Sequence, residues 1–457
     1  MKFTNSNRIL WAGYLAAIMV LMDLTSVNIA MPSLSRNLGM EMNLISWILM
    51  ISMLSATSFV LVAGKITQKH YPKKIFIIGF IIFIIGNILS WLVQDYYTLL
   101  MVRFVQGFGD SLLYVIGPAF IRQHLKEDKQ HAAYGIWMAC TGIGIAFGPL
   151  LGGLILQYLS PSYVFLINVP FAIIGLVLVI PVGNQAQAQV QTQAQAQAQA
   201  DFKGAVLSFV FVGTFILGLN LLSTTELITY AISILVVSIV FLLLFIRHIK
   251  KVENPVFEIS LFKNMNFSLV AIGFFLFFLV NVGSRFLRPF YFEESKLYSS
   301  LLSGWLMMIS PMLMLLISPF SSKLSKSVKP KWICVIATLF LSVSMFMFSF
   351  WDQNTSIYFI IISMILLGIG MGLFYPTASF IGMKDLDSKN SGMGSAAIST
   401  AKSIGKLSGV LFFGLIFSLL SQINYSDVFN ADAFQWTFII ATSIALIATL
   451  INLKIRV

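Results

Sequence analysis

The sequence is poor in charged residues, which make up only 10% of its 457 positions. A typical soluble domain has roughly 25%. This shortage excludes a soluble enzyme, a nucleic-acid-binding protein and a disordered chain. Instead, the chain is 58% hydrophobic with a mean hydropathy of +0.89. That composition is typical of a polytopic membrane protein, in which each crossing helix needs about 20 apolar residues.

Cysteine and histidine are also scarce. The two cysteines, Cys140 and Cys334, lie in apolar runs, which suggests neither a disulfide scaffold nor a metal site. The four histidines lie in or beside polar connections and form no buried cluster. We therefore expect no metal and no cofactor. The sequence also lacks a nucleotide-binding glycine-rich loop, so an ion gradient is the expected source of energy.

Long apolar runs, in contrast, recur along the whole chain. Hydropathy predicts an all-α membrane protein with fourteen transmembrane helices. The predicted spans are residues 9–31, 43–64, 74–94, 98–121, 133–157, 163–183, 204–222, 227–247, 267–287, 300–320, 332–350, 356–378, 395–421 and 434–453. No small-residue cleavage site follows the first run, so we expect a retained helix rather than a signal peptide.

The basic residues predict how these spans are oriented. If the N-terminus is cytoplasmic, the inner loops and tails hold 22 of the 29 Lys and Arg residues, and the outer loops hold at most 4. Membrane proteins concentrate Lys and Arg in cytoplasmic loops. A missed or false span would invert every later loop and destroy this bias. The tally therefore predicts an even number of spans with both termini in the cytoplasm, and it also explains the net charge of +12.

The connections divide the chain into five parts. We predict an N-terminal six-helix bundle at 1–183, a Gln/Ala-rich cytoplasmic linker at 184–203, two inserted transmembrane helices at 204–247, a cytoplasmic connection at 248–266 and a C-terminal six-helix bundle at 267–457. The linker has no apolar periodicity, which indicates a solvated segment. The connection at 248–266 suits a short amphipathic surface helix. A six-two-six arrangement favours a transporter, since many transporters bind substrate between two repeats.

Two acidic residues lie well inside predicted spans. Asp23 is in the first span, and Asp110 is in the fourth, on the same helical stripe as Arg103 and Gln106. Arg103 and Asp110 are two turns apart, about 10 Å along the axis, so we do not expect a direct pair. Burial and a nearby arginine act on the pKa of a carboxyl in opposite directions, so such a group can exchange protons near neutral pH. The alternative is structural: acids that bond neighbouring helices, and an arginine that clamps backbone carbonyls.

The fifth span contains a glycine repeat. Gly144, Gly148 and Gly152 recur every four residues and form a flat face that allows close approach of another helix. Pro149 removes one backbone donor and permits a bend. Plain packing is one interpretation of this face. The functional interpretation is a contact that opens and closes during transport.

Aromatic residues are abundant, with 41 Phe, 14 Tyr and 8 Trp beside 21 Met. A cavity lined by aromatic residues, Met and one or two carboxylates would suit bulky, flat cations. The predicted substrate-binding residues are Asp23, Asn28, Trp47, Gln106, Asp110, Tyr114, Trp137, Trp305 and Tyr375. For each aromatic residue, a lipid-facing or interfacial position is the alternative.

Taken together, these segments resemble the fourteen-helix drug:proton antiporter branch of the major facilitator superfamily. The similar segments are the first-helix motif at 23–32, the fourth-helix motif at 103–109, the antiporter motif of the fifth helix at 144–153, the sixth-helix entry at 165–170 and the twelfth-helix motif at 368–376. The first-helix motif is the most specific match. The resemblance covers nearly the whole chain.

The sequence departs from the family pattern in three places. Gln68, Tyr71 and Pro72 stand where the family has Asp, Gly and Arg, and that Asp helps to hold a gate in the family. Gating here must therefore use other contacts or be weaker. Asp110 is an extra acid at a position that is usually small. Lys402 stands where the family has Arg.

The resemblance implies a major facilitator fold and a function. The chain is expected to be a proton-coupled antiporter that exports amphipathic drugs and toxic cations by alternating access across a bacterial plasma membrane. The predicted proton-coupling residues are Asp23, Asp110 and Arg103, and the predicted gating residues are Gly144, Gly148, Pro149 and Gly152. The expected partners are drugs or organic cations, protons and membrane lipids, with no nucleic acid, and the chain is expected to be monomeric.

Two alternatives to drug export stay open. One is a metabolite transporter on the same scaffold, although the glycine-proline motif of the fifth span favours antiport. The other is a membrane-embedded lipid-modifying enzyme. That enzyme would need clustered catalytic His, Asp or Glu at a membrane face, and the sequence has no such cluster.

Overall fold

The computed structural model describes residues 5–69, 72–125, 127–182, 202–221, 228–252, 259–325, 327–384, 391–423 and 431–456, and these are largely helical. Each predicted span overlaps a helix there. Among these residues, twelve helices are long and apolar enough to cross a membrane, and two further helices contain shorter apolar stretches, Trp47–Phe59 and Val206–Phe215. The chain is therefore a multi-pass membrane protein. The count of fourteen crossings stays a prediction.

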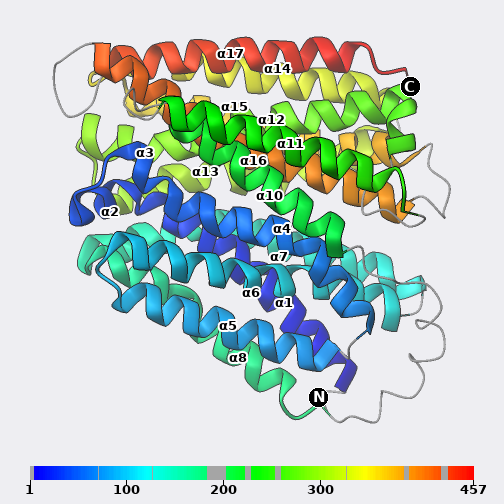
Figure 1. The fold of residues 1–457 in the computed structure, drawn as a ribbon. Helices are drawn as coiled ribbons and strands as arrows, with labels where there is room; N and C mark the ends of the chain where they lie inside the picture. Colours follow the sequence, from blue (N-terminus) through cyan, green and yellow to red (C-terminus); the bar gives the residue numbers. More distant parts are fainter. Residues whose placement is uncertain are drawn as a thin grey trace.

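The helices form two bundles and a hairpin (Figure 1). The first bundle contains α1 (Asn5–Ile29), α2 (Met31–Leu38), α3 (Met42–Ile45), α4 (Trp47–Lys69), α5 (Pro72–Leu92), α6 (Tyr96–His124), α7 (Glu127–Tyr158), η1 (Pro161–Asn168) and α8 (Val169–Val179). The hairpin pairs α10 (Phe202–Leu221) with α11 (Ile228–Ile249). The second bundle contains η4 (Ile259–Lys263), α12 (Met265–Phe290), η5 (Tyr291–Ser295), α13 (Ser300–Leu324), α14 (Pro330–Phe348), α15 (Ile357–Lys384), α16 (Ser391–Ile423) and α17 (Ala431–Leu453).

The first and last long helices fix the two ends of the molecule. Helix α1 begins and α17 ends at the same end, which we call the terminal end (Figure 1). The short helices α2 and α3 lie at the opposite end, which we call the far end. An even number of crossings requires that α1 begin and α17 end on the same side of the membrane, as they do here. Which end faces the cytoplasm stays a prediction.

The helices follow from the absence of water in a bilayer, where every backbone N–H and C=O must be paired within the protein. Three helix starts are also capped by side chains. Asp95, Asn264 and Ser299 each accept a hydrogen bond from the backbone N–H three residues further on, at 2.8, 3.2 and 3.3 Å. These caps satisfy donors that have no partner inside the helix. They begin α6, α12 and α13.

Some predicted boundaries differ from the structure. The span at 9–31 ends at Ile29, because the chain turns there into α2, which has Pro32 in its first turn. The span at 43–64 begins later, at Trp47, after the short helix α3. The span at 267–287 is longer than predicted, because α12 continues into the π-helical turn η5. Glu293 and Glu294 therefore belong to a helical end rather than a loop.

Two predicted connections fall largely outside the described residues. Most of the Gln/Ala linker at 184–203 lies there, and so do residues 253–258 of the second connection. Of the amphipathic helix predicted within 248–266, the structure describes a short 3-10 helix, η4. The side chain of Gln68 and the residue Tyr71 also lie outside the description.

Close helix contacts in the second bundle depend on glycine. Helix α12 packs along α16, where Gly283 and Gly409 bring the two backbones together. A Cβ atom on Gly409 would meet the carbonyl oxygen of Leu279 and would lie 3.0 Å from the backbone nitrogen of Gly283. Neither backbone atom can move without separating the helices. The contact therefore requires glycine at position 409.

We predict that Gly409→Ala lowers the melting temperature of the purified protein, because overpacking a tight contact costs about 1–3 kcal/mol. Gly414→Ala on the same helix is the matched control, since its Cβ would meet only a side-chain atom of Phe286, at an ordinary 3.4 Å. Alanine also favours helix over glycine by about 1 kcal/mol. The control should therefore melt at or above the wild-type temperature. Equal melting temperatures for both variants would contradict the packing described.

Candidate functional site

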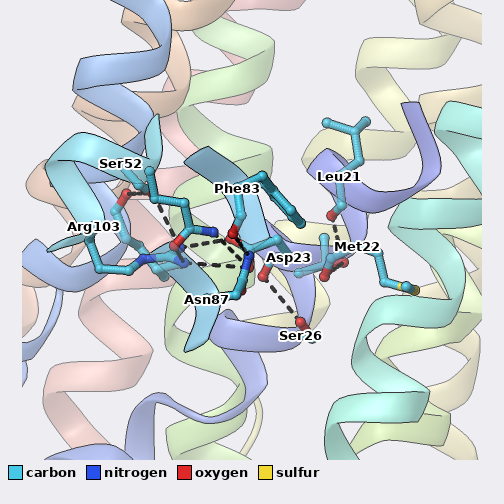
Figure 2. Close-up of polar contacts among 11 residues, drawn as sticks. Leu21, Met22, Asp23, Ser26, Ser52, Phe83, Asn87 and Arg103 are labelled. Carbon is cyan, nitrogen blue, oxygen red and sulfur yellow. Dashed lines mark hydrogen bonds and ion pairs between the residues drawn. The ribbon is translucent and has the colours of Figure 1, made fainter. Parts of the chain in front are cut away.

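A buried ion pair lies at the centre of the first bundle. Asp23 on α1 is 2% exposed and Arg103 on α6 is 0% exposed. The guanidinium donates two hydrogen bonds to the carboxylate, Nη2 to Oδ2 at 2.8 Å and Nη1 to Oδ1 at 3.4 Å. Figure 2 shows the two side chains pointing toward one another from different helices. This two-point geometry is the strongest form of an arginine–carboxylate contact.

Neighbouring polar groups complete the network around the pair. Gln106 accepts a hydrogen bond from Arg103 Nη1 at 2.8 Å and donates one to Asp23 Oδ1 at 3.4 Å. Ser52 on α4 accepts a fourth bond from Arg103, at 3.3 Å. The ring of Phe165 lies under the guanidinium, with its centroid 5.5 Å away. The network therefore joins α1, α4 and α6 with the 3-10 helix η1.

Two glycines let these helices approach closely enough to form the network. A Cβ atom on Gly107 would lie 2.7 Å from Ser55 on α4, and a Cβ atom on Gly86 would lie 2.8 Å from the Cβ of Gln106. The backbone of α6 thus lies directly against α4 and α5. This proximity holds Arg103 and Gln106 in place beside Asp23.

Three buried polar groups near this network keep an atom without a hydrogen-bond partner in the described part of the chain. They are Oδ1 of Asp110, Oδ1 of Asn28 and Oδ1 of Asn87. Asp110 is 6% exposed and forms no ion pair with Arg103 among those residues, as the two-turn spacing predicts. Asn87 on α5 was not among the predicted site residues, and Figure 2 shows it beside Asp23.

The glycine face of α7 packs on α1, the helix that carries Asp23. Gly144 lies against the backbone of Ile18, and Gly148 lies against Thr25. Thr25 also donates a hydrogen bond to the carbonyl oxygen of Gly144, at 3.3 Å. Gly152 lies against Ser26. The predicted gating residues therefore flank Asp23 on both sides along the helix.

The other face of α7 contacts the second bundle. Gly153 lies against the backbone of Ser300, and Pro149 and Leu150 lie against Gly304 on α13. Nearer the terminal end, Gly142 lies against Leu315. One helix thus contacts the acid-bearing helix on one side and the opposite bundle on the other. Movement of α1 would be transmitted across the bundle interface through α7.

The predicted aromatic residues do not converge on one place. Tyr114 and Trp137 pack together at 5.1 Å, and Trp137 lines a small hollow near the terminal end. Trp47 is partly buried at the start of α4, and Trp305 is 51% exposed on α13. Tyr375 lies in the second bundle, stacked on Phe278. The structure therefore groups Asp23, Arg103 and Gln106, and distributes the aromatic residues elsewhere.

An ion-pair cluster joins the two bundles at the far end. Arg36 on α2 lies 3.1 Å from Glu293 and 3.7 Å from Glu294, both on η5. Ser33 donates a further hydrogen bond to Glu293 at 3.3 Å. The side chain of Glu293 is only 4% exposed. This cluster therefore connects α2 of the first bundle to η5 of the second.

Positive charge within the second bundle is a feature that the site prediction missed. Arg285, Arg288, Lys402 and Lys406 all lie inside helices. Within the described segments, no ion pair joins any of them to a carboxylate. All four lie within predicted spans or at their edges, with no acid mid-span in this half of the sequence, so the sequence alone could have indicated them.

Two helical bundles, the first of which holds a buried ion pair, are typical of a membrane transporter. The sequence profile of the Major Facilitator Superfamily matches residues 13–410. The chain belongs to this superfamily. This confirms the family predicted from the motifs.

Individual relatives support the same placement. The chain is 27% identical to the riboflavin transporter RibZ of Clostridioides difficile, over 91% of this chain and 89% of that one. It is 25% identical to Multidrug resistance protein 3 of Bacillus subtilis, over 91% and 80%. Multidrug resistance proteins among the relatives support the predicted drug:proton antiporter branch. Because these relatives are bacterial, the membrane is the plasma membrane of a bacterium.

Solved structures confirm the fold. The nucleoside transporter NupG superposes with a TM-score of 0.69 at 13% identity, covering 99% of this chain and 100% of that one. The peptide transporter POT superposes with a TM-score of 0.71 at 14% identity, covering 98% and 94%. At such low identity these matches concern the fold alone.

We predict that Gly148→Leu blocks transport while much of the protein still folds, because a side chain there would displace Thr25 and the backbone of Met22, whose carbonyl oxygen lies 2.9 Å from a Cβ at this site. The control is Gly135→Leu on the same helix, where a Cβ has no neighbour within 4 Å. Dye efflux from cells, normalised to folded protein in the membrane, makes the comparison. Equal losses of folded protein and efflux in Gly148→Leu would reduce the glycine face to a packing contact.

Proposed function

We propose that this transporter is a proton-coupled antiporter that exports amphipathic small molecules, including drugs, by alternating access. The observation that carries the proposal is the buried Asp23–Arg103 pair, contacted by a helix that also reaches the opposite bundle. An ionisable residue inside a membrane is costly, and its usual reason is a proton or substrate pathway. Fourteen crossings with both termini cytoplasmic are part of the same proposal.

Protonation of Asp23 would change the energy of the network. The charged carboxylate accepts bonds from Arg103 and Gln106. A protonated carboxyl has lost its charge, so Arg103 would be left buried with Ser52 and the oxygen of Gln106 as its partners. Removing one partner of a buried ion pair costs about 3–5 kcal/mol. A rearrangement of α1 that relieves this cost would move the glycine contact with α7.

The observed conformation fits one half of such a cycle. The far end is closed by Arg36, Glu293 and Glu294, and Asp23 is paired and inaccessible. In the proposed cycle, this conformation, with Asp23 charged and the far end closed, is the one that receives substrate from the cytoplasm. Entry of a proton at Asp23 would then follow opening of the far end. Asp110 is a second candidate proton carrier, since its Oδ1 has no partner in the described chain.

The proton gradient supplies enough energy for export. A charge moving through 100 mV releases about 2.3 kcal/mol. A tenfold concentration gradient of substrate costs about 1.4 kcal/mol. One or two protons for each substrate molecule would therefore suffice.

A metabolite transporter on the same scaffold is the second candidate. The observation that favours it is the relative named as a riboflavin transporter, which matches 91% of the chain. A flat, polar heteroaromatic substrate and an amphipathic drug share an aromatic ring system. Both candidates use the same buried network, and they differ in the substrate that is recognised.

We predict that Asp23→Asn lowers proton-driven transport at least roughly tenfold, because an amide cannot exchange a proton. The assay uses inside-out vesicles, a panel of anionic, neutral and cationic dyes and a proton-sensitive fluorophore. Asp95→Asn is the control, since Asp95 is an exposed helix cap and Asn caps helices equally well. Full gradient-driven transport in Asp23→Asn would exclude Asp23 as the proton carrier.

A further inference from the structure

Positively charged side chains lie where helices α12 and α16 contact each other. Lys402 and Lys406 are one turn apart on α16. The Nζ of Lys402 lies 4.1 Å from the centroid of the Phe274 ring, and the Nζ of Lys406 lies 5.2 Å from that of Phe278. Phe274 and Phe278 are also one turn apart, on α12. Two successive lysine–phenylalanine contacts therefore cross between the helices.

Arg285 extends this charge along α12. Its Nη2 donates a hydrogen bond to Asn281 Oδ1 at 3.2 Å, and its positive charge repels that of Lys406. Tyr375 on α15 stacks on Phe278 with ring centroids 5.0 Å apart. We call Arg285, Lys402 and Lys406 the cationic cluster. All three side chains lie within helices and are partly exposed.

Among the described residues, no carboxylate forms an ion pair with the cationic cluster. In the described parts of the second bundle, Glu293, Glu294, Asp352 and Asp432 all lie at helix ends or in turns, and none forms an ion pair with the cluster. The rings of Phe274 and Phe278 offset part of the cost of these charges by cation–π attraction. Like charges one turn apart on a helix are nevertheless destabilising. A membrane protein that keeps such residues uses them for function by default.

We infer that the cationic cluster binds the negatively charged group, a carboxylate or phosphate, of a planar aromatic substrate. The stacked rings of Phe278 and Tyr375 are partly exposed beside the charges, and aromatic rings stack on such faces. In the first bundle, Asp23 is already paired with Arg103 and so is not free to bind a cation. The inference rests on the proposed function and names its substrate class. It replaces the organic cations expected from the sequence.

The test compares two dyes that share a xanthene ring and differ in charge: fluorescein, an anion at neutral pH, and a cationic rhodamine ester. Binding to the purified full-length protein in detergent is followed by fluorescence anisotropy. The wild type should bind fluorescein more tightly than the rhodamine. Lys406→Gln should weaken fluorescein binding at least about tenfold, as expected for loss of one hydrogen bond to a charged group. Lys406→Arg should retain it.

Lys323→Gln is the matched control, because Lys323 is an exposed lysine at the terminal end of α13 with its Nζ 5.8 Å from the Phe320 ring. It should bind both dyes like the wild type. Wild-type affinity for fluorescein in Lys406→Gln, or a wild-type preference for the rhodamine, would overturn the inference. If Lys406→Gln does not fold, Lys402→Gln supplies the same comparison.

The binding assay is independent of proton coupling, since no gradient is present. Tight fluorescein binding without gradient-driven transport would contradict the proposed function and support the cationic cluster as an anion site. Gradient-driven transport that is insensitive to Lys406→Gln, for anionic and cationic dyes alike, would contradict the inference and leave the proposed function standing.

Discussion

A charge buried inside a membrane must find a partner in the protein, and the first bundle is organised around that requirement. Asp23 and Arg103 come from different helices, are almost inaccessible and bond each other at two points. Gln106 and Ser52 accept further hydrogen bonds from Arg103. Separating this pair is expensive, so a proton that removes the charge of Asp23 changes the relative energies of the conformations available to α1.

Helix α7 connects that local event to the rest of the molecule. Its glycine face lies directly on α1 at Gly144 and Gly148, and its opposite face lies on α13 at Gly153. Backbone contacts of this kind have no side chains that could absorb a displacement. At the far end, the contact of Arg36 with Glu293 joins the two bundles. We propose that three features act in series: the buried pair, the glycine helix and the ion pair between the bundles.

Much of the fold could be predicted from the sequence, because apolar runs and basic loops follow from the bilayer itself. The stripe of Arg103, Gln106 and Asp110 was also predictable, since it depends only on helical spacing. The pairing of Arg103 with Asp23 was not, because it depends on which helices are neighbours. For the same reason, the sequence could not show that the glycine face of α7 packs on α1.

The sequence was least informative about which side chains are exposed and which groups contact the charged residues. Trp305 has the same apolar surroundings in the sequence as Trp137, yet it is 51% exposed while Trp137 is 7% exposed. Lys402 and Lys406 were visible as basic residues in a span, but their contacts with Phe274 and Phe278 require the neighbouring helix. That Arg36 pairs with Glu293 depends on the extension of α12 into η5, which hydropathy does not indicate.

The central claim is that Asp23 exchanges a proton when substrate binds. The most direct measurement counts protons released into a weakly buffered solution of the purified protein, with a pH indicator, when a transported dye is added. The account predicts that the wild type releases protons and that Asp23→Asn releases fewer, because the contribution of Asp23 is lost. The same number of protons released by Asp23→Asn and by the wild type would contradict it.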